Sequence, residues 1–178
     1  MTSVLHIAPH YGGGVGSVVR SLIAGQIETE FNHRLLALEV INEVTINFAI
    51  QNDVAYLQTA LADKKQLNQW IEGADIVHLH WWNHPLLMKW MVSFEMPPCR
   101  LVLWSHVNGM HAPQVFFKEI FNYPDFFVFA TGYSYQSVIL PKKKDNIRVI
   151  QSQSKVRVID GRERKKAESF NVGYIGTI

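Results

Sequence analysis

The residues best suited to chemistry are histidines that end short apolar runs. His78 and His80 belong to the stretch DIVHLHWWNH, residues 75–84. Side chains two apart on a strand point to the same face of a sheet, and the carboxyl end of a parallel strand is where open α/β sheets bind ligands. Trp81 and Trp82 follow there, where an indole ring could stack on a sugar or a base. We therefore expect His80, Trp81 and Trp82 to line a cleft, whereas a satisfied core histidine explains His78 equally well.

A zinc site is the alternative for this stretch. His78, His80 and His84 could converge on one ion, since neutral imidazoles are good zinc ligands. Apart from Asp75, no cysteine or carboxylate lies close in the sequence to complete such a site. The sequence therefore favours a site without a metal.

A second histidine ends another apolar run in the same manner. In WSHVNGMH, residues 104–111, His106 stands at the tip of a predicted strand and Gly109 opens the loop behind it. Histidine can donate or accept a hydrogen bond to a sugar hydroxyl near neutral pH. We expect His106 and its neighbour Asn108 to face a ligand, and His111 to be ordinary surface.

A glycine-rich turn, PHYGGGVGS at residues 9–17, joins the first predicted strand to the first helix. Gly13 and Gly14 allow the backbone to approach a ligand closely, and the free N–H groups of the following helix suit a phosphate. A tight turn without a ligand remains an alternative. A dinucleotide fingerprint is incomplete, because its third glycine position falls on Ser17. Glu39 could still bind a ribose, so a nicotinamide cofactor stays a second alternative.

Strand-like runs alternate with helix-like segments along the chain, which predicts a parallel sheet covered on both faces. The fold class is therefore α/β, a Rossmann-like sheet of about seven strands. The predicted strands are residues 4–8, 34–40, 54–58, 75–80, 101–106, 126–130 and 147–151. The predicted helices are residues 15–27, 42–52, 61–71, 85–94, 113–121 and 134–140.

Composition narrows the function classes. The 178 residues are 48% hydrophobic and 18% charged, so a sizeable core is available. The net charge of +2 and the lack of a basic, aromatic-rich stripe argue against nucleic acid as a partner. The start lacks the features of a signal peptide and no apolar run is long enough to span a bilayer, so we expect a cytoplasmic protein.

Four segments in order resemble the retaining glycosyltransferases of family 4, which have the GT-B fold. They are the Gly13-Gly14-Val15 turn, DIVHLHW at 75–81, WSHVNG at 104–109 and VGYIG at 172–176. The resemblance implies two Rossmann-like domains that face each other across a cleft. The first domain mainly binds the acceptor, and the second grips a nucleotide-sugar and supplies a glutamate pair and a basic clamp.

The resemblance also implies roles for single residues. Gly13 and Gly14 match the loop that approaches the donor phosphate, His106 matches the histidine that contacts the donor sugar, and His80 matches a cleft histidine. The family often carries an acidic residue at the position of Gly16 and a basic one at that of Ser17, so the contacts of this turn differ here. The nucleotide-sugar is a substrate, and the resemblance implies neither a cofactor nor a metal.

The expected organisation is an acceptor-side domain over residues 1–152, a linker over 153–169 and the start of a truncated donor-binding domain over 170–178. Such a chain should be inactive by itself. The expected partners are a nucleotide-sugar donor and a glycan or lipid-linked acceptor. Basic stretches at 142–144 and 162–166 could contact an anionic membrane, although solvated loops are the preferred interpretation. A nicotinamide-binding oxidoreductase domain and a non-catalytic sugar- or nucleotide-binding subunit are the competing functions.

Overall fold

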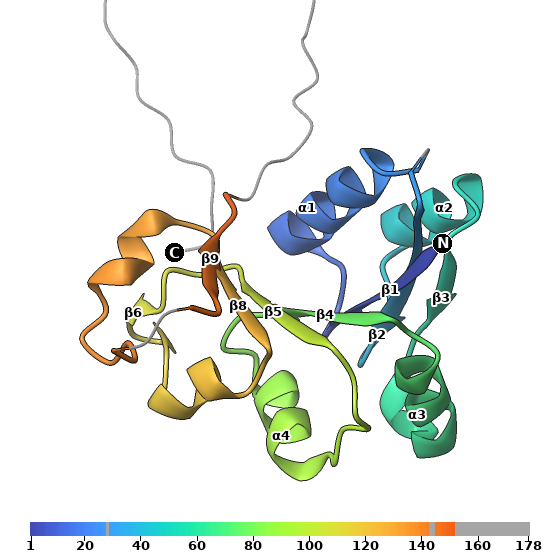
Figure 1. Cartoon of the computed structure of the whole chain (residues 1–178). Helices are drawn as coiled ribbons and strands as arrows, with labels where there is room; N and C mark the ends of the chain where they lie inside the picture. The colour runs from blue at the N-terminus through green and yellow to red at the C-terminus, as the bar shows by residue number, and fades with distance from the viewer. Residues whose placement is uncertain (28, 143–144, 152–178) are drawn as a thin grey trace, which may run out of the picture.

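A computed structural model describes residues 1–27, 29–142 and 145–151 of the chain. Its main sheet has seven parallel strands in the order β3-β2-β1-β4-β5-β8-β9, which confirms the predicted Rossmann-like α/β class (Figure 1). These strands are β1 Thr2–Ala8, β2 Phe31–Ala37, β3 Ala55–Leu57, β4 Ile76–Trp81, β5 Leu101–Ser105, β8 Phe126–Phe129 and β9 Ile147–Val149. The expected linker and second domain lie outside the described residues.

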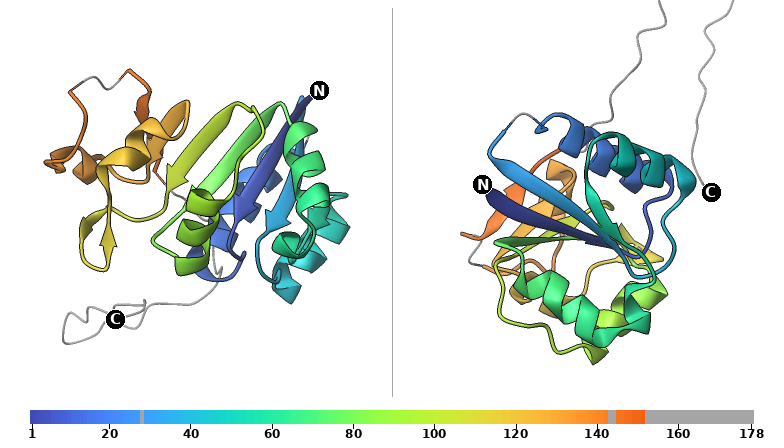
Figure 2. Two further views of the ribbon diagram at one scale, coloured as in Figure 1. Left: turned by 90° about the horizontal axis from the view of Figure 1, so that it is seen from below. Right: turned by 90° about the vertical axis from the view of Figure 1, so that its right-hand side faces the viewer.

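Four α-helices cover the two faces of the sheet: α1 Gly13–Ala24, α2 Glu43–Gln51, α3 Lys64–Glu72 and α4 Pro85–Ser93. Helices α1 and α2 lie on one face, and α3 and α4 on the other (Figure 1; Figure 2, left, where the green helices α3 and α4 stand in front of the sheet). The helix starts follow local chemistry, because the side chains of Asn42 and Asp63 accept hydrogen bonds from the first turns of α2 and α3. Pro85 opens α4, where its missing N–H costs nothing.

The core has two parts, one on each side of the sheet. On the α3 and α4 face, Leu79 and Trp81 pack with aromatic residues such as Phe127. On the α1 and α2 face, a smaller cluster gathers around Tyr11 and Leu35. Since alternate residues of a strand point to opposite faces, Leu79 and Trp81 face one cluster while His78 and His80 face the other way.

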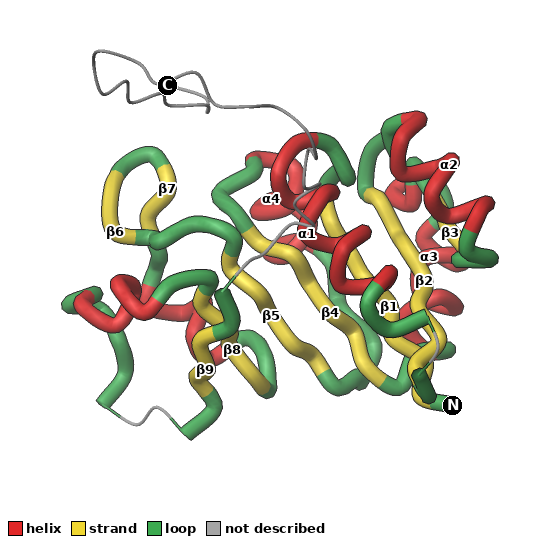
Figure 3. Tube along the Cα trace, turned by 90° about the horizontal axis from the view of Figure 1, so that it is seen from above, coloured by secondary structure: helices red, strands yellow, loops and turns green. Residues whose placement is uncertain are grey.

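Two of the predicted helices are wrong. Residues 113–121 form the hairpin strand β7 Gln114–Val115, paired with β6 Met110–His111, and then a 3-10 turn at Lys118–Asn122 (Figure 3). Phe116 is buried against Gly109 and the aromatic core, and this long-range packing overrides the local helical spacing.

Residues 134–140 contain only a 3-10 turn, Gly132–Gln136. The Ser134 hydroxyl donates to the carbonyl of Asn108, and the Thr131 hydroxyl accepts from the N–H of Tyr133. Such side-chain bonds compete with a regular helix. Helix boundaries also shift elsewhere, since α1 begins at Gly13 instead of residue 15 and ends at Ala24 instead of residue 27.

The glycines at the start of α1 are not equivalent. A Cβ on Gly16 would overlap the backbone carbonyl of Tyr11, whereas a Cβ on Gly14 would meet no atom of residues 1–27, 29–142 or 145–151 within 4 Å. Tyr11 cannot move aside easily, because its hydroxyl donates to the carbonyl of His6 at 2.7 Å and its own carbonyl accepts from Thr45. This packing against the turn explains why position 16 is a glycine here.

We therefore expect Gly16→Ala to lower the free energy of unfolding by about 2 kcal/mol, the cost of overpacking. Gly14→Ala is the matched control and should raise it by up to about 1 kcal/mol, because alanine loses less entropy in a helix. Urea denaturation followed by circular dichroism measures both. Equal stability of the two variants would contradict the contact between Gly16 and Tyr11.

Candidate functional site

The order in which successive strands are added to the sheet reverses between β1 and β4. From this pair the strand order runs outward both ways, to β2 and β3 on one side and to β5, β8 and β9 on the other. Ligands of open α/β sheets bind outside the carboxyl ends of the strands at such a switch point. The glycine-rich turn follows β1, the segment 82–84 follows β4, and His106 follows β5. The fold therefore brings these three segments to one edge of the sheet.

Three aromatic rings meet beside the switch point. His10 lies 5.3 Å from Trp82 and 5.6 Å from His84, between ring centroids, and Trp82 lies 5.8 Å from His84. All three pairs are edge-on. Trp82 is partly buried and directly follows the carboxyl end of β4. His10 and His84 were not expected to act with it, since the register between β1 and β4 is needed to bring them together.

The glycine-rich turn leaves the start of α1 uncapped. Gly13 has a φ of +59°, and no heavy atom of the described residues lies within 4 Å of a Cβ built on Gly13 or Gly14. Gly12 precedes the helix without a side-chain cap, and the first turn carries no acid. The N–H of Gly12 donates to His10 Nδ1 at 3.2 Å. Open space next to free N–H groups at a helix start is suited to an anion.

His106 lies directly after β5, at the carboxyl edge. Its backbone N–H donates to the carbonyl of Trp81 at 2.9 Å, which fixes the loop to the end of β4. Its ring Nε2 is 2.8 Å from His80 Nδ1, and its centroid is 5.1 Å from that of Trp104. Burial lowers the pKa of His106 from 6.5 to about 4, so the ring is neutral at physiological pH.

The bond between His106 and His80 is one link of a longer series on the same face of the sheet. His80 Nε2 lies 2.9 Å from His6 Nδ1, and His6 Nε2 lies 2.9 Å from His33 Nδ1. His6 and His80 are fully buried. Burial, with the repulsion of neighbouring histidines, holds the pKa values of His6 and His80 well below 6.5, and burial also lowers the pKa of His33. Four neutral imidazoles therefore cross the sheet from β2 to the end of β5.

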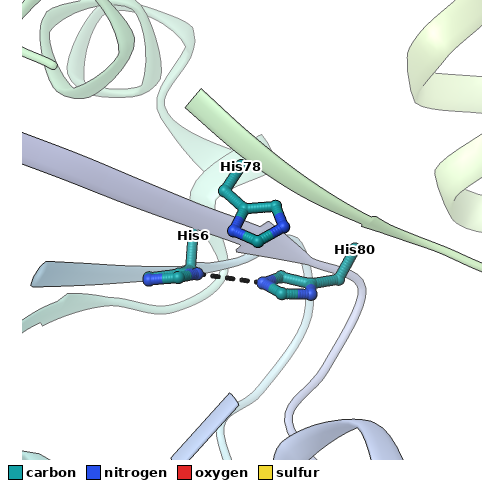
Figure 4. Close-up of side chains that lie close together, drawn as sticks. All are labelled: His6, His78 and His80. Atoms are coloured by element: carbon teal, nitrogen blue, oxygen red, sulfur yellow. Dashed lines mark hydrogen bonds between the residues drawn. The ribbon is translucent and has the colours of Figure 1, made fainter. Parts of the chain in front are cut away.

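His78 lies next to this series without joining it. Its ring stacks on Trp104 with centroids 5.6 Å apart, its Nε2 is buried without a hydrogen-bond partner within the described part of the chain, and desolvation lowers its pKa to about 3. Nitrogens of His6, His78 and His80 lie within 4.8 Å of one another (Figure 4). Among the described residues this group could hold a metal, but His6 and His80 already point their nitrogens at each other. His84, the third histidine of the alternative zinc site, lies 5.6 Å from His10 instead.

The remaining predicted site residues are less accessible than expected. Trp81 is fully buried on the α3 and α4 face, where it packs 5.5 Å from Phe116, so it belongs to the core and does not face the edge where Trp82 lies. His80 is also fully buried and contacts the edge only through His106. The side chain of Asn108 accepts from the N–H of Met110 at 2.9 Å, which shapes the loop behind His106.

His6 and His33 were not singled out from the sequence. A histidine inside the apolar run VLHIA, at residues 4–8, is a signal that was available, because strands buried on both faces are normally continuously apolar. His33 carries no comparable local signal.

Solved structures that are similar to this chain include a glycosyltransferase and a dehydrogenase. A glycosyltransferase from Rickettsia africae ESF-5 matches 84% of the chain and 42% of its own length, with a TM-score of 0.52 and 17% sequence identity. The chain thus spans less than half of that protein. A glucose dehydrogenase from Haloferax mediterranei, in complex with NADP, zinc and gluconolactone, matches 86% of the chain and 36% of its own length, with a TM-score of 0.40 and 12% identity.

No protein-family profile and no curated protein sequence matches the chain. The first structural match supports a glycosyltransferase-like fold. Among the helices in the described ranges, none combines the length and the apolar character that a bilayer crossing requires.

Proposed function

We propose that this chain is the acceptor-side domain of a retaining GT-B glycosyltransferase, which moves a sugar from a nucleotide-sugar to a glycan or a lipid-linked acceptor. The observation that carries the proposal is that the glycine-rich turn, Trp82 and His106 follow the carboxyl ends of β1, β4 and β5, at one edge of the sheet. The fold shared with a glycosyltransferase supports it. In this proposal the protein works in the cytoplasm, and residues 170–178 begin a donor-binding domain.

Different residues of this chain would assist different parts of the sugar transfer. The leaving diphosphate develops negative charge, and preorganised N–H groups at Gly13 and Gly14 would stabilise it. His106, neutral and held in place by His80, would hydrogen-bond a hydroxyl of the donor sugar and so orient the reacting carbon. Trp82 offers a flat apolar face to the acceptor. Retention follows if the leaving phosphate activates the acceptor on the same face of the sugar.

The donor contact can be tested through Gly14 in the full-length protein. Gly14→Asp places a carboxylate in open space where the donor phosphate would approach, so binding of UDP- or GDP-sugars should weaken by about tenfold, roughly one close charge repulsion. Gly14→Ala is the neutral control and should bind within about twofold of the wild type, because the site is open. Isothermal titration calorimetry measures both affinities. Equal affinity of Gly14→Asp and Gly14→Ala would place the donor elsewhere.

The same titrations separate the competing functions. Micromolar binding of NAD, with no response to any nucleotide-sugar, would overturn the transferase proposal in favour of an oxidoreductase domain. Glu39 would then be the acid that contacts the ribose, since its N–H donates to the carbonyl of Pro9 at 2.9 Å beside the glycine-rich turn. Nucleotide-sugar binding without any transfer would indicate the non-catalytic subunit.

A further inference from the structure

The four histidines of β2, β1, β4 and the loop after β5 form a series with one polarity. Each link joins the Nδ1 of one ring to the Nε2 of the next: His33 to His6, His6 to His80, and His80 to His106, at 2.9, 2.9 and 2.8 Å. The planes of linked rings differ by 27°, 21° and 29°. We call these four residues the histidine chain. Because the angles between ring planes are small and the nitrogens face each other, each hydrogen bond can lie close to the plane of both imidazoles.

The protons of the histidine chain can be counted. A neutral imidazole has one N–H and one bare nitrogen, and each link needs one of each. The four rings therefore satisfy all three links only when every ring has the same tautomer. Either each ring carries its proton on Nδ1, or each carries it on Nε2. The protonated nitrogen of His106 is thus tied to that of His33, at the other end.

The surroundings of His33, at one end of the histidine chain, favour one of these two tautomeric states over the other. His33 Nε2 is buried and has no hydrogen-bond partner among the residues that the structure describes. If every ring were protonated on Nε2, this atom would be a buried N–H with no acceptor, and orphaned buried N–H groups are rarer in proteins than under-satisfied acceptors. If every ring is protonated on Nδ1, His33 Nε2 is only an unused lone pair. The second state is therefore the more stable.

We propose that His33, His6 and His80 are positioning residues that hold His106 in the neutral form with its proton on Nδ1. His106 then presents a hydrogen-bond donor at the carboxyl edge of β5. A ligand group that contacts this nitrogen must be an acceptor, such as a hydroxyl, carbonyl or phosphoryl oxygen. Only the identification of that ligand with a donor sugar rests on the proposed function; the tautomer itself does not.

The tautomer can be read directly from the ¹⁵N-labelled 178-residue chain near neutral pH. Long-range ¹H–¹⁵N correlation spectra distinguish a protonated from a bare ring nitrogen. We expect His106 Nδ1 to have the shift of a protonated nitrogen and His106 Nε2 that of a bare one. The opposite assignment, or an average of the two, would overturn the proposal without any variant.

Two variants of His33 test whether the tautomer is transmitted through the histidine chain. A side-chain oxygen of ionised His33→Asp lies near the position of Nδ1 and can only accept a hydrogen bond, so His6, His80 and His106 should all move their protons to Nε2. His33→Asn has the same shape and can still donate, so it is the matched control. We expect the fraction of His106 protonated on Nδ1 to be at least severalfold lower in His33→Asp than in His33→Asn.

Two results would contradict the transmission. Equal His106 spectra in the Asp and Asn variants would show that His33 has no influence on His106, whatever the effect on folding. A transition metal found by elemental analysis, together with metal-shifted ¹⁵N signals of His6 and His80, would also contradict it, because the metal would occupy the facing nitrogens. Neither result depends on transferase activity, so failure of this proposal is distinguishable from failure of the proposed function.

Discussion

Lowering the pH from about 7 to about 5 is expected to remove about 4 kcal/mol or more from the free energy of unfolding. The cause is a group of histidines that are buried and neutral in the folded chain. Burial lowers the pKa of His78 to about 3 and that of His106 to about 4, from 6.5. The stability of a typical domain is about 5–15 kcal/mol, so this loss should bring the protein close to acid unfolding.

The sign follows from the depressed pKa values. Between about pH 4 and 6.5 the unfolded chain binds protons at these positions and the folded chain does not, so acid favours the unfolded state. The stabilisation is complete above 6.5 and is lost as the pH falls. At about pH 5, His78 and His106 each account for roughly 2 kcal/mol. His6 and His80, whose pKa values are also held low by burial, act in the same direction.

Urea denaturation at a series of pH values measures this loss. His78→Phe provides the control, because no described residue hydrogen-bonds His78 Nε2 and a phenyl ring can keep the stacking on Trp104. Its stability should fall less steeply with acid, by about 1.4 kcal/mol per pH unit. If the wild type were equally stable at both pH values, the histidines could not be buried in the neutral form.

His106→Ala in the full-length protein is expected to lower kcat by about a hundredfold or more, the usual effect of removing a group that acts on the reacting centre. This expectation rests on the proposed contact between His106 and the donor sugar. The ring lies at the end of the histidine chain and at the edge of the sheet, so its loss should affect turnover more than folding. Steady-state kinetics with a nucleotide-sugar donor measures the effect.

His111→Ala is the control, because His111 lies exposed in the hairpin five residues further on. It should keep the turnover of the wild type. Circular dichroism should show that both variants are folded. Full activity of His106→Ala would show that His106 does not contact the reacting sugar. Its resemblance to the histidine of family 4 would then reflect a shared fold and no shared role.

The order of elements was largely predictable, because strands buried on both faces and amphipathic helices leave local signals. All seven strands of the main sheet and helices α1–α4 were expected within a few residues. Two predicted helices, residues 113–121 and 134–140, are not α-helices in the structure. In residues 113–121 the packing of Phe116 against Gly109 determines the backbone conformation. In residues 134–140 the Ser134 hydroxyl donates to the carbonyl of Asn108. Neither contact is visible in local spacing.

The candidate site was predictable in part for the same reason. The positions of the glycine-rich turn and of His106 at strand ends follow from the chain order alone, since the carboxyl ends of parallel strands share one edge. Whether Trp81 or Trp82 faces that edge depends on where β4 ends. The strand continues through Trp81, which places this ring in the core and leaves Trp82 outside.

The sequence by itself determined that this protein has a parallel α/β sheet with a glycine-rich turn and histidines at its strand ends. Only the tertiary structure decided which histidines act together. His33 and His6 are 27 residues apart, His6 and His80 are 74 apart, and His80 and His106 are 26 apart. Their contacts depend on the strand order and on a register in which His6 pairs with His78. A register is set by the packing of whole strands, so no local pattern could have revealed the histidine chain.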